Sequence, residues 1–333
     1  MISLGKTVYL SLAGLLLFSA SAQAEGTLDR VKQRGHLLCG TSTGIAGFSI
    51  ADAQGNWVGL DVDICRALAA AIFDDPSKIR FISLSSKDRL TALQTGEIDV
   101  LPRTTTWTLS RDVGQGLNFT AVNYYDGQGF QVRAKSGIKS VKELEGASIC
   151  TVQGTTNELN LSDYFRVHKM KYEVATFSGI DETVNAYESG RCDAISTDIS
   201  QLVSYRLKMA DPTEHVLLPD VISKEPIGPY VRQGDDQWFD IVRWTVFALI
   251  NAEELGVTQA NVSEMLKSNN PEVRRLLGAE GSFGVGLGLT ADWIARIVKH
   301  VGNYGESFDR NLALLWHKGV VRRGSRIPLR RFA

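Results

Sequence analysis

Apolar segments of strand length alternate with segments of helical periodicity, and this alternation runs through the chain twice. In the first pass the strand-like segments are residues 36–40, 80–84 and 98–101. Leucine or isoleucine recurs at every fourth position between the first two segments, at residues 60, 64, 68 and 72, which is typical of a helix face. Residues 86–95 form a second helical stretch that ends at Gly96. This order predicts a parallel-type sheet, because each strand must cross over a helix before it pairs with the next.

The second pass begins at residues 140–143, where serine and glutamate have the spacing of a capping box. Its strand-like segments are residues 147–152, 172–177 and 193–196, and its helices open at residues 154–156 and 180, the latter ending near Gly190. The stretches ALQTGEIDV (92–100) and AYESGRCDA (186–194) share one plan: a helix end, a glycine, a charged residue, an aspartate and a strand. Any two strand–helix units share part of this plan, but here both halves carry the full alternation. We therefore predict an α/β chain of two lobes.

Two segments connect the predicted lobes. The first crossing is residues 124–129, and the second crossing, residues 223–231, contains two prolines and a glycine that suit an extended path. After it, residues 238–249 form an amphipathic helix that we expect to return to the first lobe. We predict lobe 1 from residues 25–124 and 230–333, lobe 2 from residues 125–229, and a ligand cleft between them with the two crossings as its hinge.

The first 24 residues have the pattern of a secretory signal peptide. Lys6 is the only charge before Glu25, residues 8–18 are almost entirely apolar, and residues 22–24 fit the small-residue cleavage pattern. The apolar run is too short to span a bilayer, and the alternative is a buried N-terminal helix. No later segment offers about 20 uninterrupted apolar residues, since the best candidate, residues 241–250, contains Arg243. We expect cleavage after Ala24 and export to the periplasm.

The four cysteines, Cys39, Cys65, Cys150 and Cys192, allow three disulfide pairings, or none if all remain buried thiols. Export favours disulfides. We favour Cys39–Cys65 and Cys150–Cys192, because each of these bonds stays within one predicted lobe. A bond between the lobes would fix their relative position.

Composition argues against several other classes of protein. The formal net charge is −1 over 333 residues, so we expect no nucleic-acid partner. No pair of cysteines forms C-x-x-C and no histidine lies at metal spacing, so we expect no metal. There is no Walker loop for nucleotide binding, and we expect no cofactor.

Polar side chains follow the third strand of each predicted lobe, at the sheet edge where open parallel sheets bind ligands. Arg111 can hold a carboxylate through two parallel hydrogen bonds, and the threonines from residue 104 to 106 add hydroxyl donors. In lobe 2, Thr155 and Thr156 stand at a predicted helix start, where free N–H groups attract an anion. Asp198 can accept hydrogen bonds from an ammonium group. One positive and one negative anchor across a cleft suit an α-amino acid.

Each of these residues also has a structural alternative. Arg111 can form a surface ion pair with Asp112 or another carboxylate. Asp198 can cap the helix that follows it, and the threonines can belong to an ordinary polar loop.

The chain resembles the periplasmic solute-binding proteins of polar-amino-acid ABC importers, and most of all their general L-amino-acid-binding branch. GNWVGLDVDICRALAAAI (55–72) is similar to the signature helix of the family. TTTWTLSRD (104–112), QGTTNELNL (153–161) and GRCDAISTD (190–198) stand where the family keeps its ligand site. The stretch of residues 222–262 is similar to that branch alone, and the resemblance covers nearly all of the mature chain. It implies the two-lobed type II fold of periplasmic binding proteins.

The resemblance also implies a role for individual residues. The ligand carboxylate is expected at Arg111, Thr106, Thr155 and Thr156. The ligand amino group is expected at Asp198 and Thr104. The ligand side chain is expected near Phe48, Arg103, Asn157 and Ser42.

The sequence departs from the family pattern at three places. Ile45 stands where many relatives place an aromatic ring, and Arg103 stands where many carry a small residue. Arg103 can bind acidic ligand side chains, or it can pair with Asp99 or Glu97, and both alternatives stay open. These departures predict broad specificity. The chain ends in RRGSRIPLRRFA, whose five arginines can either contact anionic lipid or remain solvated.

By this resemblance we expect a monomer that closes on an L-amino acid by hinge motion and delivers it to a membrane permease with its ATPase. One alternative is a periplasmic dehydratase acting on prephenate or arogenate, for which Glu158 is the nearest candidate acid. Another is an amino-acid sensory module that serves a receptor. We assign no catalytic residue.

Overall fold

The computed structural model describes residues 25–317, so the predicted signal peptide and the arginine-rich end lie outside the described residues. The first part contains α1 (Thr27–Arg34), β1 (Leu37–Thr41), β2 (Ile50–Ala51), β3 (Trp57–Val58), α2 (Leu60–Phe73), β4 (Ile79–Ser83), α3 (Arg89–Thr95), α4 (Leu109–Gly114) and β5 (Leu117–Phe119). The middle part contains β6 (Tyr124–Asp126), β7 (Gln128–Arg133), β8 (Ser148–Val152), α5 (Thr156–Val167), β9 (Glu173–Phe177), α6 (Ile180–Glu188), β10 (Ala194–Asp198), α7 (Ile199–Lys208) and β11 (His215–Leu217). The last part contains β12 (Glu225–Ile227), β13 (Tyr230–Arg232), α8 (Asp236–Glu254), α9 (Val262–Met265), α10 (Pro271–Leu276), α11 (Phe283–Gly286), α12 (Trp293–Val301) and α13 (Tyr304–His317).

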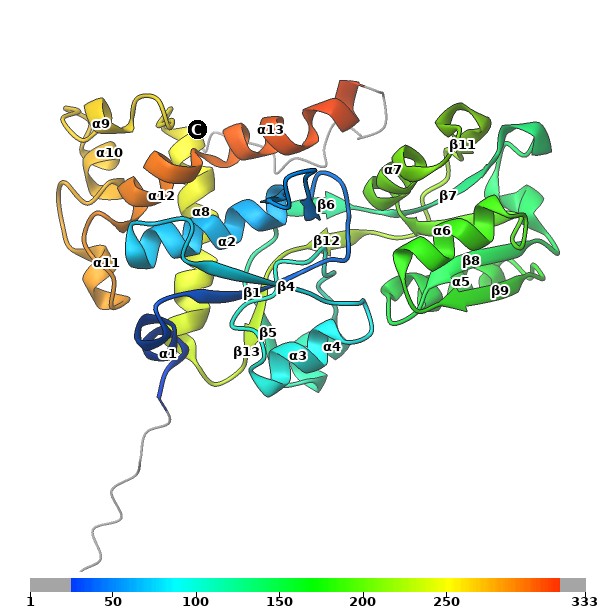
Figure 1. Cartoon of the computed structure of the whole chain (residues 1–333), viewed down its shortest axis with the longest axis horizontal. Coiled ribbons are helices and arrows are strands. Elements are labelled where there is room, and N and C mark those ends of the chain that lie inside the picture. Colours follow the sequence, from blue (N-terminus) through cyan, green and yellow to red (C-terminus); the bar gives the residue numbers. More distant parts are fainter. Residues whose placement is uncertain (1–24, 318–333) are drawn as a thin grey trace, which may run out of the picture.

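The middle part builds one five-stranded sheet, in the order β11-β7-β10-β8-β9 (Figure 1). β8 runs parallel to β9 and β10, as the strand–helix alternation predicts. β7 alone runs the other way, because it pairs antiparallel with β10 on one side and with β11 on the other. The predicted α/β class is confirmed, but the sheet is mixed rather than purely parallel.

The first part of the chain forms a second, smaller set of strand pairs. β1 runs parallel to β4, and β13 pairs antiparallel with β5. The predicted strand at residues 98–101 is wrong as a regular strand. Val100 makes one parallel bridge to Cys39, and Leu101 makes one antiparallel bridge to Tyr230. Pro102 follows at once, and proline has no N–H with which to extend a ladder.

Two predicted helix starts differ from the structure because local side-chain bonds compete with the helix. α3 begins at Arg89, since the Ser85 and Asp88 side chains close a turn just before it. The predicted capping box at residues 140–143 is a short 3₁₀ turn, Val141–Leu144. Ser140 accepts a hydrogen bond from the Lys142 N–H, but Glu143 accepts one from the Lys139 N–H instead of completing the box.

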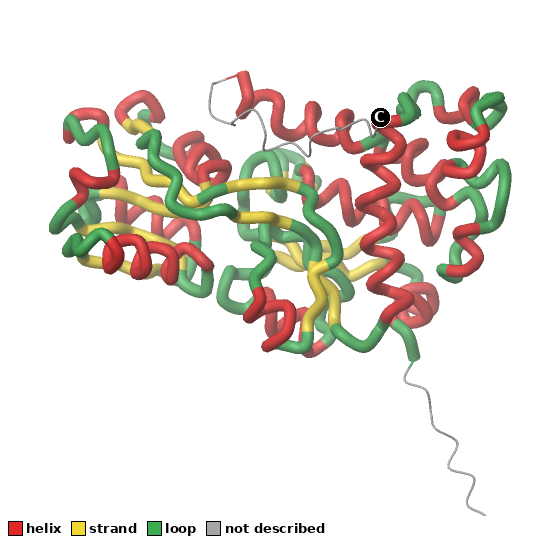
Figure 2. Tube along the Cα trace, turned by 180° about the vertical axis from the view of Figure 1, so that it is seen from behind, coloured by secondary structure: helices red, strands yellow, loops and turns green. Residues whose placement is uncertain are grey.

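The two predicted crossings lie side by side as an antiparallel ribbon. β6 and β12 pair with Tyr124 opposite Ile227 and Asp126 opposite Glu225. Figure 2 shows these strands passing between the two groups of helices. Because the crossings are hydrogen-bonded to each other, the connection between the lobes acts as one ribbon. The exact lobe boundaries, residues 125 and 229, stay a prediction.

Both favoured disulfides are present. Cys39 of β1 is bonded to Cys65 of α2, and Cys150 of β8 is bonded to Cys192, which precedes β10. The first bond joins a strand to a helix, and the second joins a strand to the turn before its neighbouring strand. Within residues 25–317, no helix is both long and apolar enough to cross a membrane.

The second crossing passes so close to the first lobe that one position requires glycine. A Cβ built on Gly228 would lie 1.9 Å from the Ala121 carbonyl oxygen. We expect Gly228→Ala to destabilise the protein by about 1–3 kcal/mol, the usual cost of overpacking, as measured by urea unfolding. Gly286→Ala is the control, because its Cβ meets nothing within 4 Å. Equal stability of both variants would contradict the close approach.

Candidate functional site

Arg111 lies buried on α4, with 6% of its surface exposed. Its guanidinium donates to the Thr106 carbonyl at 3.0 Å. Asp112 accepts from the Trp107 indole N–H and from the Phe119 N–H instead. The alternative of a surface ion pair between Arg111 and Asp112 is therefore wrong. Burial lowers the pKa of Arg111, against the opposing influence of Tyr230, Glu225 and Asp198.

The loop that precedes α4 is strained and buried. Thr104 has φ +35°, a left-handed conformation that is costly for a β-branched residue. Its N–H donates to the Asp61 carboxylate at 3.0 Å, while its hydroxyl has no hydrogen-bond partner within the described chain. An unpaired buried hydroxyl is uncommon in folded proteins and calls for an explanation, and a hydrogen bond to a ligand would supply one.

The same loop is fixed to the second crossing by backbone hydrogen bonds. The Trp107 N–H donates to the Pro226 carbonyl at 2.8 Å, and the Gly228 N–H donates to the Thr105 carbonyl at 3.3 Å. The Tyr230 hydroxyl also donates to the Thr106 carbonyl, at 2.9 Å. The threonine loop, residues 104–106, is therefore positioned by the segment that joins the lobes.

Arg103 is completely enclosed, with 1% of its surface exposed. It donates to the Leu84 carbonyl at 2.9 Å and to the Ser86 hydroxyl at 3.3 Å. The alternative pairing with Asp99 or Glu97 is wrong, because Asp99 binds Arg34 and the Leu38 N–H, and Glu97 is exposed. Burial lowers the pKa of Arg103 to about 10.

Sequence reasoning missed Arg89, at the start of α3. This side chain is 3% exposed, and its Nε has no partner within the described residues. Burial, followed by the positive charges of Arg103 and Arg111, holds the pKa of Arg89 well below its usual value. An arginine after a serine and an aspartate at a helix start has the pattern of a surface residue, so its sequence gave no signal.

On lobe 2, both threonine hydroxyls are already used. Thr155 donates to the Val152 carbonyl at 2.8 Å, and Thr156 donates to the Glu225 carboxylate at 3.0 Å. Thr155 is the N-cap of α5 but makes no side-chain capping bond. The first N–H groups of α5, rather than the hydroxyls, are the donors left for an anion.

Asp198 ends β10 and is 3% exposed. Asp198 occupies the N-cap position of α7, but its side chain makes no capping hydrogen bond. The alternative that this side chain caps the helix is therefore wrong. Its two oxygens accept from Asn157 at 3.0 Å and from Gln201 at 3.1 Å. Burial raises the pKa of Asp198 well above its usual value, and the nearby carboxylates Asp126 and Glu225 add to this.

Asp126 and Glu225 are two further carboxylates that sequence reasoning missed; Glu225 is buried and Asp126 is half-buried. They face each other in the ladder between the crossings. Burial raises the pKa of Asp126 to about 6, against hydrogen bonds from Ser200 and Gly127. The available signal in the sequence was one acidic residue in each crossing, since these segments are otherwise apolar or rich in proline and glycine.

Phe48 and Ser42 lie buried in the first lobe. The Phe48 ring packs edge-on against Tyr124, with centroids 5.1 Å apart, and the Ser42 hydroxyl donates to the Ser49 carbonyl at 2.8 Å. Ile45 and Phe48 belong to one hydrophobic cluster with residues of α7. The Ala46 N–H also donates to the Ser204 hydroxyl of α7 at 2.7 Å, so the lobes are in contact beside the site.

Together these residues place positive and negative groups close enough to interact electrostatically. Arg89 and Arg111 interact electrostatically with Asp198, and Arg111 also with Glu225. No direct ion pair joins these arginines to those acids among residues 25–317. Nor do the described residues contain a group of histidine, cysteine or acidic side chains suited to a metal ion. This arrangement can hold a ligand that carries both charges.

Comparison with known proteins places the chain in a family. Residues 37–261 match the family model of bacterial extracellular solute-binding proteins, family 3. The general L-amino acid-binding periplasmic protein AapJ of Rhizobium johnstonii is 52% identical, over 93% of this chain and 95% of that protein. The glutamate/glutamine/aspartate/asparagine-binding protein BztA of Rhodobacter capsulatus is 46% identical, over 95% and 94%. A periplasmic binding protein of Brucella ovis, solved with glutathione bound, has a TM-score of 0.85 and 53% identity, and covers 92% of this chain and 100% of its own.

Asp61 predicts a measurable pH dependence of stability. Burial raises its pKa to about 8, against the Thr104 N–H and the charges of Arg103 and Arg89. The folded state therefore holds a proton that the unfolded state releases near pH 4, so folding stability falls as pH rises from about 4 to 8. Asp61→Asn should remove up to about 1.4 kcal/mol per pH unit of that decline, as measured by urea unfolding between pH 5 and 8. Parallel pH profiles for both proteins would show that Asp61 has no such shift.

Proposed function

The chain belongs to the bacterial extracellular solute-binding proteins of family 3, and we propose that it binds L-amino acids between its two lobes and delivers them to the permease of an ABC importer. The observation that carries this proposal is that two groups of buried charge occur together. The positive pole consists of arginines on lobe 1, and the negative pole consists of carboxylates on lobe 2 and the second crossing. An α-amino acid brings a carboxylate and an ammonium group, one for each pole. Burying either pole without such a partner is costly.

We assign the ligand carboxylate to Arg111, to Thr106 and to the N-terminal N–H groups of α5. The ligand ammonium group is assigned to Asp198, with the unpaired Thr104 hydroxyl beside it. Thr155 and Thr156 act through their backbone, since their hydroxyls are used within the protein. Asn157 orients Asp198 through its hydrogen bond to that carboxylate.

We expect broad specificity because the site contains more charged side chains than are needed to bind the carboxylate and ammonium groups of one zwitterion. Arg89 and Arg103 remain on the positive side, and Asp126 and Glu225 remain on the negative side. Because Arg103 is bonded to a carbonyl and a serine, Arg89 is the freer guanidinium and the better candidate to meet an acidic ligand side chain. Phe48 and Ser42 stay assigned to the ligand side chain; in the described structure both are fully buried, and the Ser42 hydroxyl is bonded to Ser49.

Delivery requires the protein to alternate between open and closed forms. The ligand stabilises the closed form only through contacts that the open form lacks. Arg111 belongs to one lobe and Asp198 to the other, so a zwitterion gains its second anchor only on closure. The paired crossings β6 and β12 supply the hinge. The permease and ATPase partners, the monomeric state and the signal peptide of residues 1–24 belong to the same proposal.

The dehydratase alternative requires a free general acid near the site. Its candidate, Glu158, accepts a hydrogen bond from the Gly154 N–H at 2.7 Å and so serves the loop before α5. Incubation with prephenate should therefore give no product. Turnover of prephenate would replace the transport proposal with an enzymatic one.

Removal of Arg111 tests the proposal at its main anchor. Arg111→Ala should abolish binding of L-amino acids in calorimetry, because no other described guanidinium occupies its place on α4. Asp198→Asn should weaken binding by at least about 1.5 kcal/mol, the low end for a hydrogen bond to a charged group. Arg166→Ala is the control, since that side chain is 75% exposed at the far end of α5. Wild-type affinity in the Arg111 variant, with the fold intact, would contradict the assignment.

The two remaining arginines can be separated by ligand choice. Arg89→Gln should weaken L-glutamate binding at least tenfold more than L-leucine binding. Arg103→Gln should weaken both ligands by similar factors, because it disturbs the loop rather than one ligand group. Competition with both amino acids at fixed ionic strength measures the two ratios. Equal losses for both ligands in Arg89→Gln would leave that residue without a role in specificity.

A further inference from the structure

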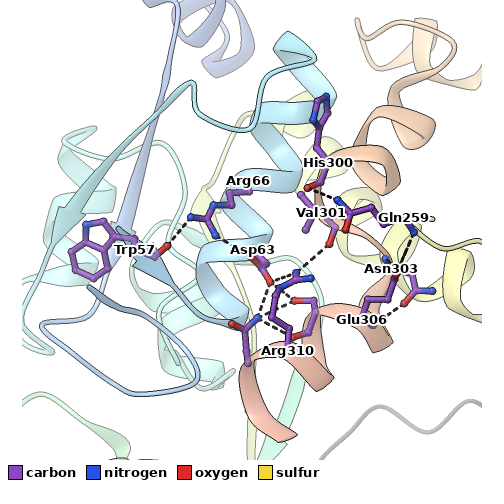
Figure 3. Close-up of polar contacts among 11 residues, drawn as sticks. Trp57, Asp63, Arg66, Gln259, His300, Val301, Asn303, Glu306 and Arg310 are labelled. Carbon is purple, nitrogen blue, oxygen red and sulfur yellow. Dashed lines mark hydrogen bonds and ion pairs between the residues drawn. The ribbon is translucent and has the colours of Figure 1, made fainter. Parts of the chain in front are cut away.

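Asp63, a buried carboxylate on α2, bonds this helix to α13, the last helix of the described chain. Asp63 is 2% exposed, and its Oδ2 accepts three hydrogen bonds from α13: from Ser307 at 2.7 Å, Arg310 at 2.6 Å and Asn311 at 2.7 Å. Figure 3 shows Arg310 pointing towards Asp63, with Arg66 of α2 on the other side.

Hydrogen bonds also fix the start of α13. Asn303 and Glu306 form a reciprocal capping box, with the Glu306 N–H donating at 2.9 Å and the Asn303 N–H at 2.8 Å. Gln259 donates its backbone N–H to the same glutamate at 3.1 Å, a contact that Figure 3 also shows. The helix is therefore fixed relative to lobe 1.

α13 also contacts the residues where the first crossing leaves lobe 1. The Tyr304 hydroxyl donates to the Asn123 carbonyl at 2.7 Å. The Phe308 ring stacks on Tyr124 with centroids 6.4 Å apart, and Tyr124 in turn packs on Phe48. The face of α13 that meets Asp63 continues into the face that holds the hinge ribbon.

The first turn of α2 reaches the ligand site from the same place. Asp61, two residues before Asp63, accepts the N–H of the strained Thr104. α2 therefore contacts the threonine loop through Asp61, and α13 contacts the first crossing through Tyr304 and Phe308. Asp63 joins these two helices to each other.

We propose that Asp63 is a positioning residue for the amino-acid site: by holding α13 on α2, it fixes the threonine loop and the lobe 1 end of the first crossing while lobe 2 moves. This inference rests on the proposed function for its consequence in binding. Its structural part concerns backbone order and can be measured without any ligand.

The test compares Asp63→Asn and Tyr304→Phe with the full mature chain, using hydrogen exchange and calorimetry with L-glutamate and L-leucine. We expect Asp63→Asn to speed exchange at least tenfold in residues 103–107 and 123–126, with no change in β8, and to raise both dissociation constants at least tenfold. Tyr304→Phe, which removes one hydroxyl and leaves the ring, should speed exchange at residues 123–126 alone. Ser307→Ala, which removes one of the three donors to Asp63, should speed exchange in residues 103–107 and keeps the test decisive if Asp63→Asn does not fold.

Asp292→Asn is the matched control, because it breaks the 3.1 Å contact with Arg296 on α12 without touching α13 or the crossings. Exchange in the threonine loop that rises equally in the control, at the same loss of thermal stability, would overturn the inference. So would unchanged exchange in the test variants. If the wild-type protein binds no amino acid, the proposed function fails, and the exchange data still decide whether Asp63 positions the loop and the crossing.

Discussion

Buried charges of opposite sign face each other without direct contact, and the rest of the structure is arranged around them. The buried Arg89, Arg103 and Arg111 come from the first lobe. The buried Asp198 comes from the second lobe, and the buried Glu225 and half-buried Asp126 come from the crossings. Charges removed from water are costly unless they are paired and hydrogen-bonded. The protein meets part of this cost with neutral donors and with raised carboxylate pKa values. In the proposed function, a zwitterion between the two sets would offset more of this cost and would thereby favour the closed arrangement of the two lobes.

The hinge ribbon, formed by β6 and β12, connects the charged groups of the site to the segments that join the two lobes. The threonine loop bonds to the second crossing, Asp126 and Glu225 lie on the crossings themselves, and α13 supports the first crossing through Tyr304 and Phe308. A change in the ribbon therefore changes the site directly. The loop strain at Thr104 belongs to the same design, since a β-branched residue persists at positive φ only where its surroundings fix it.

Much of this architecture could be predicted from the sequence, because its signals are local. Periodic leucines give α2, and the glycine after Thr95 ends α3. The lobe argument gave both disulfides, and the polar ends of the strands led to Arg111 and Asp198. Other features arise only from tertiary contacts. Nothing local tells Arg89 from a surface arginine, assigns Asp61 and Asp63 of one helical turn to two different partners, or shows that the Thr155 and Thr156 hydroxyls are used within lobe 2.

The central claim is that an L-amino acid lies between Arg111 and Asp198 with its two charged groups oriented towards them. A crystal structure of the refolded protein with L-glutamate tests this most directly. We predict the α-carboxylate within hydrogen-bond distance of Arg111 and the α-ammonium group within hydrogen-bond distance of Asp198. A ligand bound elsewhere, or bound in the opposite orientation, would contradict the account.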